Sequence, residues 1–267
     1  MFVENTCDFN LEQTFECGQC FRWNSDGEGY IGVVGGHVIK AEYCGGGIKI
    51  DCADEAFAIR YFDLERNYSQ IINAINKDEI IKKAISRGRG IRLLRQEPWE
   101  TLVSFIISAN NNIPRIKKII ESLCKSFGKR LQYEGKEYYT FPTAEALSNL
   151  EPCDLFEARC GFRDKYIIDA AKKVASGVVD LQNIYDINAD EGRQILKEVK
   201  GVGDKVADCV LLFAYQKFEV FPKDVWIKRI VNDLYGVDSK GIDEFVSKRF
   251  GGYGGFAQQY LFNYARN

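Results

Sequence analysis

The sequence predicts an α+β fold, with a small antiparallel β-sheet domain at residues 1–78 packed on an all-helical region at residues 79–267. Short runs rich in β-branched and aromatic residues, separated by Gly-rich turns, occupy the first part of the chain. Beyond residue 55, apolar residues recur at helical spacing, with Pro near helix starts and Gly or Asn at helix ends. The length of 267 residues is sufficient for two domains.

The predicted strands lie within the first 51 residues. The segments between them, NSDGEG, GG and CGGG, consist of residues that favour tight reversals of the chain. Successive strands joined by such short turns pair in the antiparallel sense. The expected strands are FRW (21–23), YIGVVG (30–35), HVIKAEY (37–43) and IKID (48–51).

The predicted helices follow from their start and stop signals. Pro98 suits the first turn of a helix WETLVSFIISA that ends at Asn110–Asn112. The next helix begins near Pro114 and ends at Gly128, and KYIIDAAKKVAS ends at Gly177. Further helices are expected at 190–198, 204–216, 225–234, 242–250 and 254–265, without an internal repeat or a linker.

The charge of the chain is balanced overall but uneven locally. There are 36 Lys and Arg residues against 38 Asp and Glu residues, a net charge of −2, which argues mildly against a nucleic-acid partner. However, residues 82–95 hold six basic and no acidic residues, and residues 115–130 hold six basic residues against Glu121. Each patch is either a phosphate-facing surface or a solvated helix face.

Single-residue counts exclude several chemistries. His37 is the only histidine, so a two-histidine metal site cannot form, nor can a Ser-His-Asp triad without that residue. The nine cysteines include no closely spaced set of four for an iron–sulfur cluster, and the pair Cys17 and Cys20 has no second pair at zinc-ribbon spacing. The start, MFVENTCDFN, has no basic or apolar signal segment, and no apolar run is long enough to span a membrane, so we expect reduced thiols and a cytoplasmic location.

The most informative segment is residues 195–230, which reads as a helix, a Gly201-Val202-Gly203 turn and a second helix. The glycines let the backbone turn sharply and bring amide groups close to an oxygen ligand. The N-terminus of the second helix favours a phosphate at the same place. A purely structural helical hairpin has the same local pattern, so the turn alone leaves both readings open.

Two residues near this turn suggest chemistry. Lys205 lies in the first turn of a helix, where the dipole disfavours a cation, and is either an amine nucleophile or a side chain directed to solvent or phosphate. Asp224 precedes an apolar helix and is a preferred N-cap residue. A capping carboxylate at a cleft also stabilises a developing cation, so both roles are compatible.

These residues resemble a known family. KGVGDKVADC (200–209) followed by FPKDV (221–225) resembles the signature of the helix–hairpin–helix (HhH-GPD) glycosylase superfamily. ECGQCFRW (16–23), GIRLLRQEPWETLVSFIISANNNIPRI (90–116), CGFRDKY (160–166) and GGFAQQYLF (254–262) resemble segments of the 8-oxoguanine DNA glycosylases, in the same order. These motifs extend from the first predicted strand to the last predicted helix.

The resemblance implies a base-excision DNA repair enzyme, a bifunctional DNA glycosylase and lyase for abasic sites. It would bind double-stranded DNA, flip out 8-oxoguanine, cleave the N-glycosidic bond with a lysine and nick the strand by β-elimination through a Schiff base. It implies no metal or organic cofactor. We expect a monomer, associated with the nucleoid if the source is prokaryotic.

Site roles carry over by position. The matching catalytic residues are Lys205 and Asp224. For the base, the carbonyl of Gly18 would accept a hydrogen bond from ring nitrogen 7, which is protonated only in 8-oxoguanine. The residues matching those that sandwich the base and bond its pairing edge are Cys209, Phe262 and Gln258.

The matching DNA-binding residues surround this pocket. Asn110 resembles the side chain that fills the gap left by the flipped base, and Arg115 and Arg163 resemble those that read the estranged cytosine. The further expected DNA contacts are Phe162, Gly201, Gly203 and Trp226.

Three positions depart from the family pattern. Phe162 replaces a tyrosine, Trp226 replaces a histidine near a phosphate, and Lys200 replaces a proline before the hairpin. Because the tyrosine hydroxyl is lost at Phe162, we hypothesise a weaker preference for cytosine opposite the lesion.

The rival interpretations differ in mechanism. Relatives that remove alkylated purines lack a lysine at the position of Lys205, and adenine-specific and pyrimidine-specific relatives usually carry an iron–sulfur cluster. A non-catalytic DNA-binding protein would use the hairpin and the basic patches for phosphates alone. A structural helical hairpin leaves the other motifs unexplained.

Overall fold

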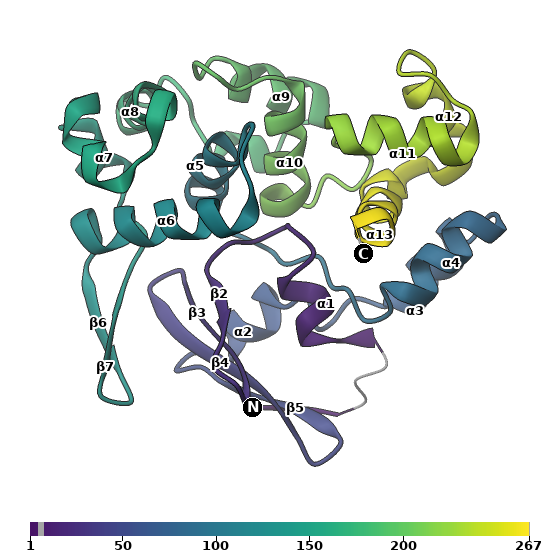
Figure 1. Ribbon diagram of the computed structural model, residues 1–267, viewed down its shortest axis with the longest axis horizontal. Helices are drawn as coiled ribbons and strands as arrows, with labels where there is room; N and C mark the ends of the chain where they lie inside the picture. The colour runs from purple at the N-terminus through teal and green to yellow at the C-terminus, as the bar shows by residue number, and fades with distance from the viewer. Residues whose placement is uncertain (5–7, 267) are drawn as a thin grey trace.

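The computed structural model describes residues 1–4 and 8–266 and contains a sheet domain and a largely helical region, as expected for an α+β fold (Figure 1). The five-stranded sheet is antiparallel throughout, with the order β1-β5-β4-β3-β2. Val33 pairs with Val38 beside the tight turn between the two longest strands. The strands are β1 (Phe2–Val3), β2 (Trp23–Ser25), β3 (Gly29–Val34), β4 (His37–Cys44) and β5 (Gly47–Asp51).

The eight helices with predicted bounds, all beyond residue 97, begin and end close to the predicted signals, whereas no bounds are predicted for the earlier helices or for Ala144–Ser148. Asn112 caps the helix that follows it by accepting a hydrogen bond from the Arg115 amide, and Gly128 ends the same helix. None of the described helices is long and apolar enough to cross a membrane. The helices are α1 (Leu11–Phe15), α2 (Glu55–Tyr61), α3 (Tyr68–Ile75), α4 (Glu79–Arg87), α5 (Pro98–Ser108), α6 (Ile113–Phe127), α7 (Ala144–Ser148), α8 (Asp164–Ala175), α9 (Ala189–Lys197), α10 (Asp204–Tyr215), α11 (Val225–Tyr235), α12 (Ile242–Phe250) and α13 (Gly254–Arg266).

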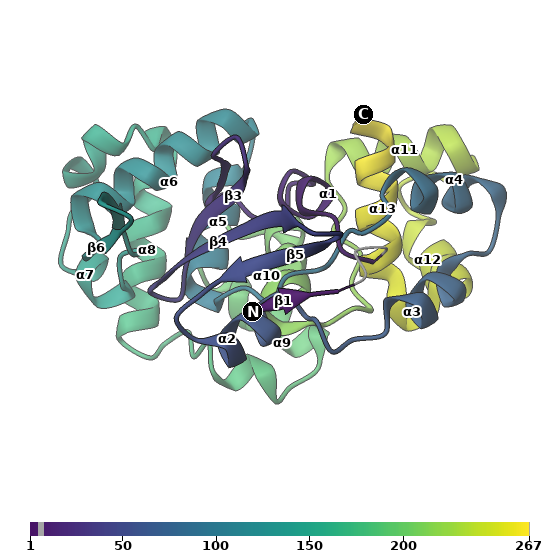
Figure 2. The same ribbon diagram turned by 90° about the horizontal axis from the view of Figure 1, so that it is seen from below.

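The chain packs around two hydrophobic cores. The smaller core lies between the sheet and α2 and contains Trp23 stacked on Phe15, with ring centroids 4.0 Å apart. The larger core joins the helices and includes residues from the loop before β2, such as Phe21. In both ribbon views α6 lies on one side of the sheet domain and α13, with α3 and α4, on the other (Figures 1 and 2). The loop before β2 therefore links the two cores.

A β-hairpin interrupts the region that the sequence predicts to be all helical. β6 (Arg130–Tyr133) and β7 (Lys136–Tyr139) pair across Glu134 and Gly135, which both have positive φ. Two successive residues with positive φ are typical of a tight hairpin turn. Tyr133 donates a hydrogen bond of 2.6 Å to Asp51 at the end of β5, so the hairpin also contacts the sheet domain.

The predicted strand FRW is displaced, because the strand begins only at Trp23. The preceding residues form the loop that joins the two cores, where Gln19 and Phe21 are buried. Neither β1 nor α1 is predicted. The strand has two residues and the helix five, and segments of this length show too little of a repeating pattern to detect.

The last two arginines of the basic patch at 82–95, Arg92 and Arg95, make contacts within the protein. Arg92 is buried and donates hydrogen bonds to the main-chain carbonyls of Phe62 at 3.0 Å and Asp63 at 2.8 Å. Arg95 forms an ion pair with the Asp63 carboxylate. Both arginines join the sheet domain to the helices. Burial excludes Arg92 from the exposed phosphate-facing surface considered from the sequence, whereas the Arg95 side chain remains 38% exposed.

Candidate active site

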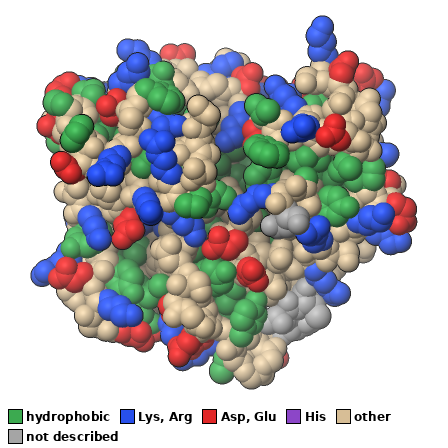
Figure 3. All heavy atoms as spheres, viewed as in Figure 1, with side chains coloured by type: hydrophobic (Ala, Val, Ile, Leu, Met, Phe, Trp, Pro, Cys, Tyr) green, Lys and Arg blue, Asp and Glu red, His purple; other side chains and the backbone are tan. Residues whose placement is uncertain are grey.

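An open cleft of about 460 Å³ lies where α5, α6, α10, α11 and α13 meet the loop before β2. Figure 3 shows a hollow in this face, bordered by hydrophobic, Lys and Arg side chains. Five of the sequence-predicted site residues line the cleft, although they come from four distant parts of the chain: Gly18, Lys205, Asp224, Trp226 and Phe262.

The hairpin turn brings the start of α10 to this cleft. Gly201 has φ +84°, and a Cβ atom there would lie 2.6 Å from the Tyr166 ring, so no other residue fits. Gly203 is the N-cap residue of α10 and is exposed. The turn therefore presents main-chain groups next to the helix N-terminus, as a phosphate contact requires.

Lys200, which replaces a proline of the family pattern, makes a main-chain hydrogen bond to α8. Its amide donates a hydrogen bond of 2.8 Å to the carboxylate of Asp169 in α8, which also pairs with Lys173 at 3.0 Å. A proline at position 200 has no amide hydrogen to donate. Asp169 thus anchors the entrance of the hairpin to α8, and the Lys200 side chain stays exposed.

Lys205 is partly buried and lines the cleft. Its Nζ donates a hydrogen bond to the hydroxyl of Ser108 at 3.3 Å and lies 5.2 Å from the centre of the Phe105 ring. Sequence reasoning missed both partners. Their spacing of three residues on α5 places them on one helix face, but only the packing of α5 on α10 shows which face meets Lys205.

Asp224 combines a capping role with a position in the cleft. Its Oδ1 accepts a hydrogen bond of 2.7 Å from the Ile227 amide, so the N-cap expected from the sequence is present. The side chain is partly buried and lines the same cleft as Lys205. Trp226, in the following turn, is 63% exposed at the cleft. The cap fixes the carboxylate without removing it from the cleft.

The expected base-binding residues come from the loop before β2, α10 and α13. Gly18 has φ +82°, and a Cβ atom there would lie 3.3 Å from Phe262. Cys209 follows Lys205 by one helical turn, and Gln258 precedes Phe262 by one turn, but both side chains are buried and do not line the cleft. The Oε1 atom of Gln258 is buried without a hydrogen-bond partner among the described residues. That amide therefore has an unused acceptor.

The thiols near the site are poor nucleophiles. Burial raises the pKa of Cys209 to about 11, although Lys205 opposes the shift. Burial also raises the pKa of Cys17 to about 11. Eight of the nine cysteines lie in the described residues, all as free thiols, and Cys7 lies outside them. Across residues 1–4 and 8–266, no group of three His, Cys, Asp or Glu side chains could hold a metal ion.

The residues expected to meet the opposite strand lie on the turn between α5 and α6 and on the segment before α8. Asn110 is exposed, with φ +49°, and Arg115 is exposed at the start of α6. Arg163 differs, because it is only 2% exposed and its guanidinium donates to the carbonyls of Ala109 and Asn110. Burial, with the nearby Arg115, lowers the pKa of Arg163.

Phe162 lies over this arginine. The Arg163 guanidinium is 4.4 Å from the centre of the Phe162 ring, and that ring is 52% exposed. Its edge also packs against Tyr166, the residue that contacts the hairpin glycine. The opposite-strand residues and the hairpin are therefore connected through aromatic contacts.

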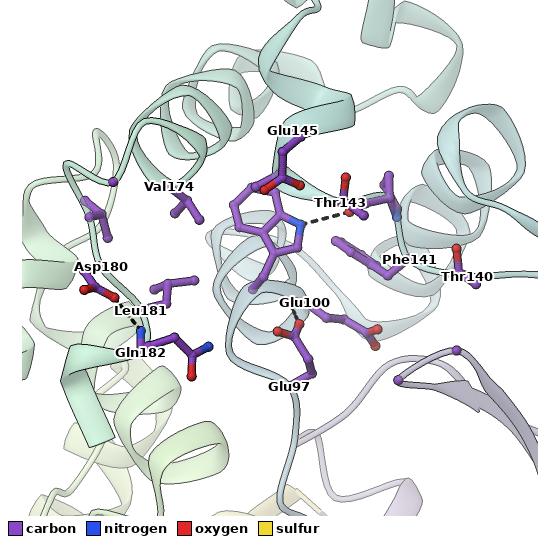
Figure 4. Close-up of a pocket in the computed structure, with 17 residues that line it drawn as sticks. Glu97, Glu100, Thr140, Phe141, Thr143, Glu145, Val174, Asp180, Leu181 and Gln182 are labelled. Atoms are coloured by element: carbon purple, nitrogen blue, oxygen red, sulfur yellow. Dashed lines mark hydrogen bonds between the residues drawn. The ribbon is translucent and has the colours of Figure 1, made fainter. Parts of the chain in front are cut away.

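A second cavity, of about 440 Å³, has different chemistry (Figure 4). Trp99 and Phe141 form part of its wall, and the acidic residues Glu97, Glu145 and Asp180 surround it. No Lys or Arg lines the cavity, and it contains none of the predicted site residues. An acidic surface repels the phosphate backbone of DNA, so the cleft at Lys205 is the candidate active site.

Comparison with known proteins identifies the family of the chain. Residues 1–102 match the family model for the N-terminal domain of 8-oxoguanine DNA glycosylase, and residues 103–250 match the HhH-GPD superfamily of base-excision DNA repair proteins. The chain is 32% identical over 228 residues to a probable N-glycosylase/DNA lyase of Methanothermobacter thermautotrophicus. The aligned residues cover 77% of this chain and 71% of that relative.

Two solved structures have the same fold over nearly the whole chain. The protein MBOgg1, in complex with a low-affinity DNA ligand, is 48% identical with a TM-score of 0.95, covering 99% of this chain and 94% of that one. The 8-oxoguanine glycosylase/lyase of Clostridium acetobutylicum, in complex with double-stranded DNA containing cytosine opposite 8-oxoguanine, is 42% identical with a TM-score of 0.94 and the same coverage. The chain therefore belongs to the 8-oxoguanine DNA glycosylase/lyase family of the HhH-GPD superfamily, a family of bifunctional base-excision repair enzymes.

Proposed function

We propose that this enzyme removes 8-oxoguanine from double-stranded DNA with Lys205 as the nucleophile. The observation that carries the proposal is the position of the Lys205 amine in one cleft with the carboxylate of Asp224. Among the described residues, Cys209 lies one helical turn from Lys205 but is unsuited to the role, because burial raises the pKa of its thiol. The amine is the nucleophile that the cleft offers.

The reaction proceeds through bonds at the sugar. The Nζ lone pair attacks C1′ of the flipped nucleotide, and the glycosidic electron pair leaves with the base, which takes up a proton. Opening of the sugar ring gives an imine between Lys205 and C1′. Loss of a proton from C2′ then expels the 3′ phosphate by β-elimination, and water hydrolyses the imine to release the enzyme.

Asp224 stabilises the positive charge that develops on the sugar as the base departs. A carboxylate fixed in advance costs no reorganisation during the reaction, which is the basis of electrostatic catalysis. The hydrogen bond from the Ile227 amide supplies this fixation. The hydrogen bond that makes Asp224 an N-cap therefore also holds its carboxylate in place for catalysis.

The base pocket uses the residues inferred from the family resemblance. The Gly18 carbonyl accepts the hydrogen bond from protonated nitrogen 7, and Phe262 contacts one face of the base, both from the cleft. Cys209 contacts the other face and Gln258 bonds the pairing edge; both are buried in the structure, so these contacts require that DNA binding makes the two side chains accessible. The unpartnered Gln258 Oε1 supports this role, because a buried acceptor without a partner is costly unless a ligand satisfies it.

The remaining contacts hold the duplex. Gly201 and Gly203 contact a phosphate through the hairpin, Trp226 contacts the DNA at the cleft, and Asn110 enters the space left by the flipped base. Phe162 packs beside the opposite base, with Arg115 and Arg163 on the same side. Since Phe162 lacks a hydroxyl, we propose that cytosine is preferred less strongly than in relatives with tyrosine.

A single-turnover assay on a duplex containing 8-oxoguanine opposite cytosine tests the function. The parent protein should release the base and nick the strand, whereas Lys205→Gln should bind the duplex and do neither. Lys200→Gln is the matched control, since it changes an exposed lysine of the same hairpin. Binding by the parent protein without base release would favour the non-catalytic DNA-binding alternative.

A further inference from the structure

Helix α13 carries two adjacent stripes of side chains with different tasks. Gln258 and Phe262, one turn apart, belong to the proposed base pocket. The second stripe is shifted by one residue and consists of polar side chains at spacings of four and three, which places them along one helix face. Its members are Gln259, Asn263 and Arg266.

The second stripe binds the segment that carries Gly18. Gln259 is 2% exposed, and its Nε2 donates a hydrogen bond of 2.8 Å to the main-chain carbonyl of Cys17, across 242 positions of sequence. Because this bond is buried, water does not replace it when it is lost. Two further bonds extend the contact: Asn263 to the Gln13 side chain at 2.8 Å, and Arg266 to the Glu16 carbonyl at 2.9 Å.

The other side of Gly18 is fixed as well. Gln19 is fully buried. Its side-chain Nε2 donates to the main-chain carbonyls of Thr14 at 2.8 Å and Arg92 at 2.7 Å. Its Oε1 accepts a hydrogen bond of 2.9 Å from the main-chain amide of Leu94. The peptide before Gly18 is therefore held by α13 and the residue after it by the segment at 92–94. Gly18 lies between two fixed points.

Such placement matters because recognition depends on one proton. Guanine and 8-oxoguanine differ at nitrogen 7 in whether the atom accepts or donates a hydrogen bond, and a carbonyl distinguishes them only when it is aimed at that atom. A mobile glycine with φ +82° would lose this aim. The discrimination therefore needs an external support for the loop.

We propose that Gln259 is a positioning residue for substrate specificity: its hydrogen bond to Cys17 sets the Gly18 carbonyl in register with the base-binding side chains of the same helix. This inference rests on the proposed function. One helix thus supplies Gln258 and Phe262 to the base and also sets the position of Gly18.

The test compares two substrates that differ in whether a base is present. Gln259→Met keeps the side-chain volume without a donor, and Gln259→Asn keeps the amide but shortens its reach. Both variants should release 8-oxoguanine about tenfold more slowly in single turnover, since displacements of an ångström cost rates of this order or more. Cleavage of a preformed abasic site, which needs Lys205 but no base contact, should stay within about twofold of the parent.

Tyr215→Phe is the matched control, because it also removes one buried hydrogen bond to a carbonyl, that of Leu181 at 2.8 Å, outside the cleft. It should leave the ratio of the two rates unchanged. An equal loss of both activities in the Gln259 variants, or no loss of either, would overturn the positioning role. A parent protein that cleaves no abasic site would instead refute the proposed function.

Discussion

Arg163 donates a hydrogen bond of 2.9 Å from Nη2 to the main-chain carbonyl of Asn110. Its Nε donates to the preceding carbonyl, that of Ala109, at 3.0 Å. The residue expected to fill the gap in the duplex is thus supported by the residue expected to read the opposite base. The turn at Asn110 has φ +49°, a conformation that needs support in a residue other than glycine.

Arg163→Met should therefore reduce stability as well as activity. It leaves the carbonyls of Ala109, Asn110 and Cys160 without this donor. The free energy of unfolding should fall by about 1–3 kcal/mol, as measured by urea denaturation. Arg115→Met is the control, because that side chain is exposed and its loss should leave the stability unchanged. Equal midpoints for the parent and Arg163→Met would contradict a supporting role.

Substitutions at Asp224 should separate capping from catalysis. Asn is as good an N-cap as Asp, so Asp224→Asn should keep the stability but slow base release by a factor on the order of 10² to 10³. Asp224→Ala should show the same kinetic loss and in addition lose about 1 kcal/mol of stability. Thermal unfolding and single-turnover rates measure the two effects. If Asp224→Asn released the base at the rate of the parent, Asp224 would be an N-cap without a catalytic role.

The preference for the base opposite the lesion should change when Phe162 is substituted. Phe162→Tyr adds one hydroxyl, and a single neutral hydrogen bond is worth about 0.5–1.5 kcal/mol, roughly a factor of 2 to 10. Rates of 8-oxoguanine release opposite each of the four bases measure the preference. The parent should discriminate weakly, and the variant should shift toward cytosine. A parent with strong cytosine preference would refute the hypothesis.

The stability of the fold should depend on Glu100. Burial, reinforced by Glu97 and opposed by Arg22, raises the pKa of Glu100 from 4.5 to about 7. Between these values the folded state binds more protons than the unfolded state, so stability falls as pH rises from about 4.5 to 7. The stabilisation is fully present below pH 4.5 and is lost above pH 7.

Glu100→Gln should remove this component and flatten the profile by an amount on the order of 1–3 kcal/mol. Urea midpoints at several pH values between 4 and 8 measure the slope. Glu100 and Glu145 both line the acidic cavity of Figure 4, and Glu145 is exposed, so Glu145→Gln should retain the slope of the parent. Parallel profiles for the parent and Glu100→Gln would show that another group titrates.

Much of the fold follows from local signals in the sequence. Pro98, Gly128 and Asp224 mark helix ends that depend only on neighbouring residues, and the structure confirms each one. The hairpin β6–β7 escapes prediction, because its eight strand residues lie between strong helical patterns. Its Glu134-Gly135 turn is the local signal that could have identified it.

The site is less accessible to sequence reasoning, because its contacts are long-range. The motif residues Lys205 and Phe262 do reach one cleft, as the family resemblance implies. By contrast, the partner of Gln259 is 242 positions away, and the local pattern assigns Arg92 to a charged patch although it is buried. A side chain whose partner is a main-chain carbonyl elsewhere has no signature in its own neighbourhood.

The most direct test of the mechanism is covalent trapping. The parent protein is incubated with a duplex containing 8-oxoguanine and treated with borohydride, which reduces an imine to a stable amine. We expect a protein–DNA adduct that maps to Lys205 and is absent from Lys205→Gln but present in Lys200→Gln. An adduct that persists in Lys205→Gln, or base release by the parent without any adduct, would contradict the assignment of Lys205 as the nucleophile.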